Sequence, residues 1–257
     1  MSPPLLLLDV ADQIAFLTLN HPEKRNALSR AMLMQLRDRL SELAGRKDAH
    51  AVVLRATGTV FSSGHDLREL ADCSSADATS LFALCTDVML AIRNLAQPVI
   101  AQVQGLATAA GCQLAVTCDL VIAAEDAGFA TPGVKIGLFC TTPGVAVARA
   151  APAKKALEML LTGTPISAAE AERIGMINRV VPRAKLVEET LALARQIAAA
   201  SRATVALGKR AFYEQVPLAC AAAYAAAQPV MVANAGMRDA QEGIRAFLEK
   251  RTPKWEE

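Results

Sequence analysis

The chain lacks a strong charge of either sign and lacks a long apolar run, and each absence excludes a class of protein. Its 257 residues contain 27 Lys and Arg against 25 Asp and Glu, so the bulk charge favours no nucleic acid and no membrane surface as a partner. No run approaches the roughly 18 apolar residues that span a bilayer. Residues 5–8 follow no Lys or Arg and lead into Asp9, which predicts a strand rather than a signal peptide. We therefore expect a cytoplasmic protein.

Spacing typical of metal ligands is missing as well. The six cysteines are Cys73, Cys85, Cys112, Cys118, Cys140 and Cys220. Their separations match no zinc or iron–sulfur pattern. Without an export signal they are expected to be reduced thiols, several of them buried, and we predict no metal site. Hydrophobic residues make up 53% of the chain, a share that favours a compact or oligomeric protein.

Short apolar runs alternate with helical patterns through the first two-thirds of the chain. The runs 14–19, 51–56, 99–103 and 120–123 predict strands, and apolar residues at helical spacing predict helices around 32–43, 81–95 and 143–149. Ser74 with Asp77 and Ser167 with Glu170 match the capping box that starts a helix. From Ala184 onward the pattern is helical, so we place a boundary near Ser201, between a β/α core (1–200) and a helical tail (201–257).

Residues 105–119 form a run of small residues that opens a helix after an apolar strand. The first N–H groups of a helix have no partner within it, and small side chains let a ligand approach them. Such donors suit a developing negative oxygen. Close helix packing, which also needs small residues, explains the same pattern equally well.

A second segment of this kind, residues 57–67, favours the ligand-binding interpretation. Here a strand ends in a small-residue turn that should leave the N–H groups of Ser63 and Gly64 free. Together with segments 21–28, 166–171, 175–182 and 242–251, these two segments occur in the order found in the enoyl-CoA hydratase/isomerase (crotonase) family. The chain resembles that family over nearly its whole length.

The resemblance implies a fold, a substrate class and an assembly. The fold would be α/β, a crotonase (ClpP-like) spiral of ββα units with a helical C-terminal tail. The tail would serve trimerisation, giving a homotrimer or homohexamer. The substrate would be an acyl-CoA thioester of fatty acid metabolism, with CoA as part of the substrate and no separate cofactor. The N–H groups of Ser63 and Ala110 would hold the thioester oxygen of an enolate.

The same resemblance assigns a binding site for CoA. Arg25 would contact phosphate by charge, and Ala27 would contact the adenine through its backbone. Asp66 and Leu67 would wrap the adenine, and Lys209 would reach the nucleotide phosphates. For Arg25 and Lys209 the alternative is a solvated surface charge, which is the usual place of a single Lys or Arg.

Both carboxylates of a family hydratase are absent. The resemblance places them at positions 113 and 133, where this chain has Gln113 and Gly133. A hydratase needs two groups that exchange protons near neutral pH, and an amide cannot do so. The following loop, residues 137–143, is longer than usual and brings Cys140 and two threonines near the expected acyl pocket. These threonines would form a turn and cap a helix through Thr142, or direct a polar group at the substrate.

His65 is the remaining candidate catalytic residue, beside Ser63 in a Gly-His-Asp-Leu sequence. A single histidine is usually structural, but family members that decarboxylate malonyl-type CoA esters have similar segments and also lack the hydratase carboxylates. Three functions remain open. The protein is an enzyme that uses the oxyanion donors alone, as a decarboxylase or thioester hydrolase; a weak hydratase or isomerase; or a catalytically silent acyl-CoA binding protein.

Overall fold

The computed structural model describes residues 4–256, and its centre is a six-stranded sheet. The strand order is β1-β2-β3-β5-β7-β10, in which β1 and β2 form an antiparallel hairpin and the other neighbours are parallel. The strands are β1 (Leu6–Ala11), β2 (Ile14–Leu19), β3 (Ala51–Ala56), β5 (Val99–Val103), β7 (Leu120–Ala124) and β10 (Arg179–Val181). Three predicted strands, at 14–19, 51–56 and 99–103, are confirmed to the residue.

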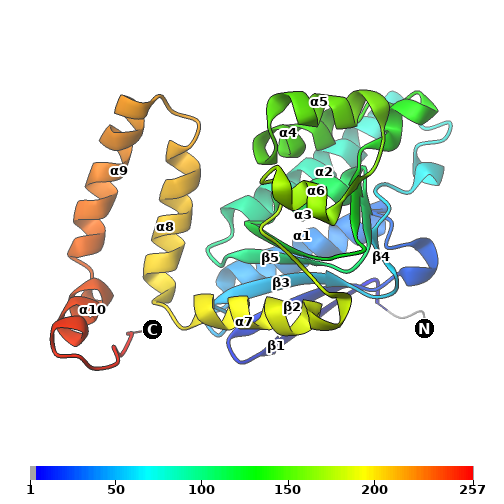
Figure 1. Ribbon diagram of the computed structural model, residues 1–257. Helices are drawn as coiled ribbons and strands as arrows, with labels where there is room; N and C mark the ends of the chain where they lie inside the picture. The colour runs from blue at the N-terminus through cyan, green and yellow to red at the C-terminus, as the bar shows by residue number, and fades with distance from the viewer. Residues whose placement is uncertain (1–3, 257) are drawn as a thin grey trace.

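Helices cover both faces of this sheet, which explains why its strands are almost continuously apolar. In β3, Val52 and Leu54 face a core shared with α1 (Arg30–Gly45) and α2 (Ser75–Asn94), whereas Ala51 and Val53 face α7 (Leu186–Ala198). Figure 1 shows α7 running along the lower face of the sheet. The period of two along the strand thus divides one apolar run between two cores.

A second, smaller sheet places the candidate site. Its strands are β4 (Val60–Ser62), β6 (Leu106–Thr108), β8 (Gly128–Ala130) and β9 (Ile166–Ser167), in that order. The first three each follow a strand of the large sheet, and this repetition of strand, strand and helix confirms the predicted crotonase-like ββα spiral. Because β4, β6 and β8 are neighbours, the segments that follow them meet at one edge.

In the described part of the chain, the core contains four further helices, and their starts agree with the predictions only in part. They are α3 (Ala110–Thr117), α4 (Thr141–Ala150), α5 (Ala153–Thr162) and α6 (Ala168–Arg173), with short 3-10 turns η1 (Pro22–Lys24), η2 (Leu67–Glu69), η3 (Pro132–Ile136) and η4 (Arg183–Lys185). Both predicted capping residues act as such, because the Ser74 and Ser167 hydroxyls each accept an N–H at 3.1 Å. Thr142 does not cap α4, which begins one residue earlier without a side-chain cap.

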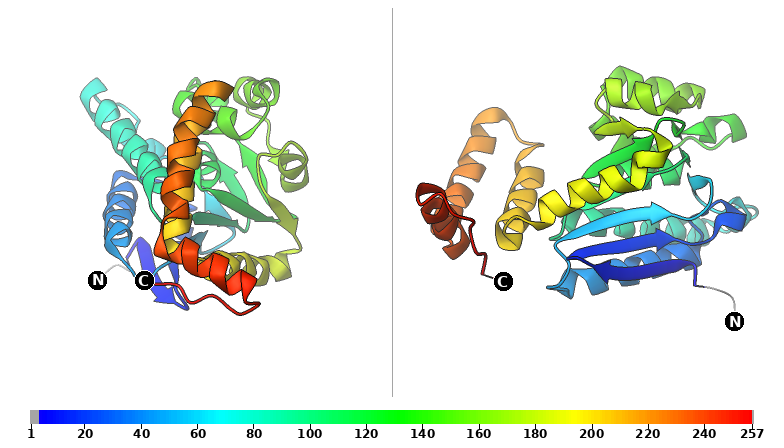
Figure 2. Two further views of the ribbon diagram at one scale, coloured as in Figure 1. Left: turned by 90° about the vertical axis from the view of Figure 1, so that its left-hand side faces the viewer. Right: turned by 60° about the horizontal axis from the view of Figure 1, so that its bottom comes forward.

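The C-terminal helices stand apart from the sheet, as Figures 1 and 2 show. They are α8 (Arg202–Gln215), α9 (Cys220–Ala235) and α10 (Arg238–Leu248). No residue of α8 or α9 is buried, and Tyr224, Met231 and Phe247 are 67–83% exposed. The division at residue 200 and the role of the tail in assembly remain predictions.

One helix corrects the expectation that no segment is long and apolar enough to span a membrane. Helix α2 has 20 residues and a window of mean hydropathy 1.4, which meets that test of length and composition. Its apolar face, including Leu81, Val88 and Ile92, is buried against the core. The core helix of a soluble protein passes the same test, so α2 is weak support for a membrane span.

Candidate active site

A buried asparagine that the sequence interpretation overlooked joins segment 21–28 to the turn around β4. The amide nitrogen of Asn26 donates to the carbonyl oxygens of Thr57 and Val60, each at 2.9 Å, and its side-chain oxygen accepts the N–H of His21 at 2.9 Å. Its φ of +51° lies in the left-handed region that asparagine tolerates better than most residues. The sequence feature that could have indicated this residue is the Asn26-Ala27 pair in segment 21–28.

Hydrogen bonds also occupy the donors predicted to be free at Ser63 and Gly64. The N–H of Ser63 donates to the carbonyl of Arg25 at 3.0 Å. The N–H of Gly64 donates to the hydroxyl of Ser62 at 3.3 Å. The prediction that Ser63 supplies an oxyanion donor is therefore wrong for this structure, because a partner 38 residues away already uses its N–H.

Two other amides near this turn have no partner. Among residues 4–256, neither the N–H of His65 nor that of Ala110 donates a hydrogen bond. Their segments touch, because a Cβ atom added to Gly64 would lie 3.0 Å from the backbone nitrogen of Ala110. Two unpaired N–H donors on adjoining segments can stabilise negative charge on one oxygen.

Glycine is required at two points where β4 and α3 meet. Gly64 has φ +85°, and its added Cβ would lie 2.9 Å from the Cβ of Ala109. An added Cβ on Gly111 would overlap the carbonyl oxygen of Ser62. The small residues of segment 105–119 therefore serve close packing as well as access to the amides.

Ala109 has a backbone conformation that a residue with a side chain rarely adopts. Its φ is 51° and its ψ is −122°, close to the first central position of a type II′ turn, where glycine predominates. Hydrogen bonds fix both of its peptide groups: its N–H donates to Ala130 at 2.9 Å, and its carbonyl accepts from Gln113 at 3.0 Å. A strained residue of this kind costs about 1–3 kcal/mol.

Neither predicted carboxylate position supplies an acid or a base. Gln113 is 5% exposed, and its side-chain oxygen has no hydrogen-bond partner among the described residues. Gly133 is buried, and an added Cβ would overlap the carbonyl oxygen of Leu138 and lie 2.8 Å from the sulfur of Cys140. The longer loop therefore fills the space into which a side chain at position 133 would extend.

The Cys140 thiol in this loop is a poor proton donor or acceptor at neutral pH. Burial raises its pKa, and the backbone of Gly133 opposes that change only in part. Nearby Cys112 is fully buried, and burial raises its pKa to about 12. All six cysteines are free thiols.

His65 is held in a defined orientation. Its Nδ1 lies 3.2 Å from the carbonyl oxygen of Leu28, and its ring packs edge-on against Phe82 with centroids 5.4 Å apart. Burial lowers the pKa of His65, although the Leu28 carbonyl and the charge of Glu69 act in the opposite direction. The imidazole is therefore neutral at pH 7 and has no positive charge to offer a carboxylate.

The predicted CoA residues around the turn differ in exposure. Arg25 is exposed and Leu67 is 53% exposed, whereas Ala27 is buried. Asp66 caps η2, and its carboxylate pairs with Arg68 at 2.5 Å, which lowers the pKa of Asp66. The carboxylate of Asp66 therefore stabilises this turn through its bonds to the backbone and side chain of Arg68.

Lys209 lies in a buried ion pair with Asp119. Its ammonium donates to Asp119 at 2.7 Å and to the carbonyls of Ile92 and Gln97 at 3.1 and 3.0 Å. Asp119 also accepts the hydroxyl of Tyr213 at 2.7 Å. Burial lowers the pKa of Lys209 despite this pairing. The prediction that Lys209 binds phosphate is therefore wrong, since all three of its donors are used.

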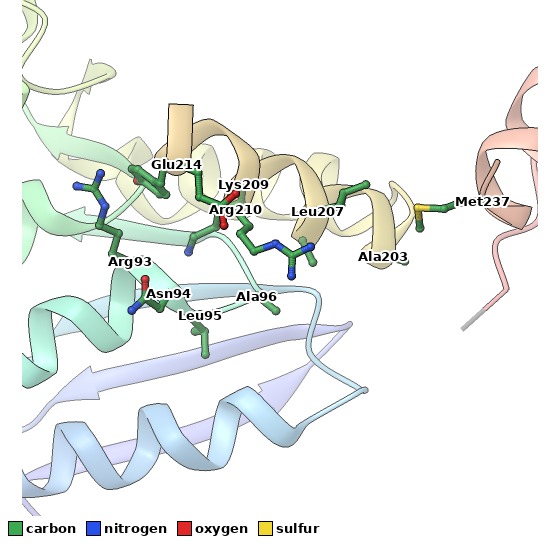
Figure 3. Close-up of a pocket in the computed structure, with 12 residues that line it drawn as sticks. Arg93, Asn94, Leu95, Ala96, Ala203, Leu207, Lys209, Arg210, Glu214 and Met237 are labelled. Atoms are coloured by element: carbon green, nitrogen blue, oxygen red, sulfur yellow. The ribbon is translucent and has the colours of Figure 1, made fainter. Parts of the chain in front are cut away.

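Lys209 and its neighbours line a cavity of about 600 Å³ between the end of α2 and helix α8, shown in Figure 3. On the core side of this cavity the guanidinium of Arg93 lies 4.2 Å from the ring centre of Tyr213. The cavity therefore marks the joint that attaches the helical tail to the core.

Comparison with known proteins confirms the resemblance. A model of the enoyl-CoA hydratase/isomerase family matches residues 9–257. Enoyl-CoA hydratase domain-containing protein 3, mitochondrial, is 51% identical in Rattus norvegicus and 52% in Homo sapiens, over 95% of this chain and 82% and 81% of those proteins. The crystal structure of the human protein has a TM-score of 0.96 and 50% identity, covering 98% of this chain and 100% of that one.

These relatives also correct the expected location. They are named mitochondrial, as are relatives from mouse, zebrafish and frog, which contradicts the cytoplasmic location inferred from the sequence. The match over residues 9–257, the level of identity and the shared fold give one conclusion: the chain belongs to the enoyl-CoA hydratase/isomerase family.

Proposed function

We propose that the chain binds an acyl-CoA thioester and holds its carbonyl oxygen with the backbone N–H groups of Ala110 and His65. The observation that carries this proposal is the pair of unpartnered amides on adjoining segments. Donors of this kind stabilise an oxygen that becomes negative, as in a thioester enolate. Losing one of them typically costs about 3 kcal/mol.

Ordinary hydration of an enoyl thioester is not part of this proposal. Hydration needs one group to activate water and another to protonate the α-carbon. Gln113 is an amide, and the packing around Gly133 leaves no room for a side chain. The nearby thiol of Cys140 has a raised pKa and is a poor substitute for either carboxylate.

We place the CoA moiety along the surface that carries Arg25 and Leu67. Arg25 supplies an exposed cation for phosphate, and Leu67 supplies an exposed apolar side chain for the adenine. A charge-assisted contact with phosphate contributes about 1.5–3 kcal/mol. Arg25→Glu should therefore weaken CoA binding tenfold or more, but a pantetheine ester without the nucleotide should bind as before.

The state of the His65 ring argues against decarboxylation of a malonyl-type thioester. A neutral imidazole whose Nδ1 donates to a carbonyl presents only a lone pair at Nε2, which repels a carboxylate. Release of CO₂ from malonyl-CoA, lost in His65→Ala, would restore that alternative.

Calorimetry with matched ligands tests the proposal. The protein is titrated with butyryl-CoA and with the S-butyl thioether of CoA, which lacks the carbonyl oxygen. We expect the thioester to bind about thirtyfold more tightly, as two hydrogen bonds of about 1 kcal/mol each give. Equal affinity would reject the oxyanion contact, and no binding of either would reject acyl-CoA as the ligand.

A further inference from the structure

The ring of His65 has one nitrogen with a partner and one without. Nδ1 lies 3.2 Å from the carbonyl oxygen of Leu28, which can only accept, so Nδ1 carries the proton. In the neutral ring Nε2 is then an unprotonated acceptor. It is out of contact with solvent and has no hydrogen-bond partner among the described residues. A buried acceptor of this kind destabilises the folded chain, so its presence points to a partner that arrives with a ligand.

The unpartnered nitrogen belongs to the residue whose own N–H is the proposed oxyanion donor. Because both nitrogens belong to one residue, a thioester carbonyl held on that N–H would lie close to the ring of His65. The carbonyl of Leu28 orients the base in the way that a third group orients the histidine of a catalytic triad.

We propose that His65 is the general base in hydrolysis of the bound thioester, an inference that rests on the proposed function. Water transfers a proton to Nε2 while its oxygen forms a bond to the carbonyl carbon. The amides of Ala110 and His65 hold the resulting oxyanion. The carbon–sulfur bond then breaks, the sulfur of CoA receives the proton from Nε2, and the products are a carboxylic acid and free CoA.

The surroundings keep the base in its neutral form. Burial lowers the pKa of the ring, and of the charged groups nearby only Glu69 on η2 acts against this. The Glu69 carboxylate is itself engaged by the backbone N–H of Arg30 at the start of α1. On α2, the packed neighbour is the uncharged Phe82, while Asp77 is bonded to Ser74 at the surface. The base is therefore ready at neutral pH and is lost as the pH falls below its lowered pKa.

The test follows release of free thiol from butyryl-CoA by the wild-type protein and by His65→Gln. Glutamine can still donate to the Leu28 carbonyl but cannot take up a proton. We expect release to fall at least a hundredfold, in line with the usual contribution of a general base. The wild-type rate should fall in acid, whereas the residual rate of the variant should not follow that profile.

His50→Gln is the matched control, because the Nδ1 of His50 contacts a carbonyl, that of Ala198, at a similar 3.1 Å. It should leave the rate unchanged. Calorimetry with butyryl-CoA on each variant reports folding and binding separately from turnover. Tight binding without thiol release, or release unaffected in His65→Gln, would overturn the role of His65 and leave the proposed function standing. Absence of binding would overturn the proposed function itself.

Discussion

The sulfur of Cys140 lies 2.8 Å from the point where a Cβ atom on Gly133 would stand. The Leu138 carbonyl overlaps that same point, and the N–H of Leu138 donates back to Gly133 at 2.9 Å. The loop is thus closed around a residue without a side chain. Gly133 stands where the resemblance places a carboxylate, and the backbone packed around it leaves no room for a side chain, so a single substitution at this position should not supply one.

Hydration of crotonyl-CoA should be far below the typical enzyme rate of about 10 per second. Gln113→Glu should not restore it, because the second group remains absent. Gly133→Glu should lower the melting temperature by displacing residues 138–140. Gly45→Glu is the matched control, since nothing lies within 4 Å of that position. Loss of the enoyl absorbance, followed with contaminant-free protein, is the measurement, and rapid turnover would contradict this prediction.

Ala109→Gly should stabilise the fold. Glycine adopts φ 51° and ψ −122° without the steric penalty, although it gains more entropy on unfolding. The net gain should be about 1 kcal/mol, which raises the melting temperature by about 2–4 °C in a protein of this size. Ala110→Gly, one residue into the helix, should instead lower it. A melting temperature for Ala109→Gly at or below that of the wild type would show that Ala109 is unstrained.

Lys209→Met should cost about 3–5 kcal/mol, because it leaves Asp119 buried without its cation. Urea unfolding measures this loss. Affinity for CoA should stay within twofold of the wild type wherever the variant is folded, since Lys209 has no free donor. A selective loss of CoA affinity with normal stability would show that Lys209 contacts the nucleotide after all.

Acid should destabilise the fold partly through His65. Burial lowers its folded pKa below the ordinary 6.5, so between these two values the unfolded chain binds the additional proton. The stability that the neutral His65 contributes is therefore fully present above pH 6.5. It is lost as the pH falls from 6.5 to the lowered pKa of the folded state. His65→Gln should reduce the difference between unfolding free energies at pH 7.5 and pH 5.5. An unchanged difference would mean that His65 titrates alike in both states.

The helical tail should assemble the chain into a trimer or hexamer. Tyr224, Met231, Val232 and Phe247 are more than two-thirds exposed on α9 and α10, and a face of this kind is rarely left open to water. Light scattering at micromolar concentration should give a multiple of 27.1 kDa. Met231→Glu should lower the measured mass, whereas Lys154→Glu, at an exposed position of α5 in the core, should not. A wild-type monomer would refute this expectation.

Most of the large sheet was predictable because local patterns specify it, although its three-residue edge strand β10 was not predicted. Runs such as Ile14–Leu19 and Ala51–Ala56 are long enough for their apolar character to decide the assignment, and turn residues mark their ends. Strands β4, β6 and β8 have three residues each, which is too short for any period to be read. The second sheet therefore emerges only from pairing between distant segments.

The candidate site was predictable in its motifs and less so in its donors. Ser63 and Lys209 were assigned from resemblance, yet the partners that occupy them lie 38 and 90 or more residues away. No local pattern reveals such a partner. The strain at Ala109 escaped notice for a related reason: an alanine in a small-residue run looks suited to a helix, and only the junction with β6 forces its φ positive.

The pairing of segment 25–28 with the turn at 62–64 has a consequence for how the ligand is measured. Ser63 bonds to Arg25, the hydroxyl of Ser62 bonds to the carbonyl of Asn26 at 2.8 Å, and Leu28 bonds to Gly64 at 2.7 Å. Arg25, proposed to meet the nucleotide, is therefore joined by these bonds to the turn that leads into His65, whose N–H is proposed to meet the thioester. We expect this pairing to fix the separation of the two contacts, so that a carrier with a pantetheine arm shorter than that of CoA would reach only one of them.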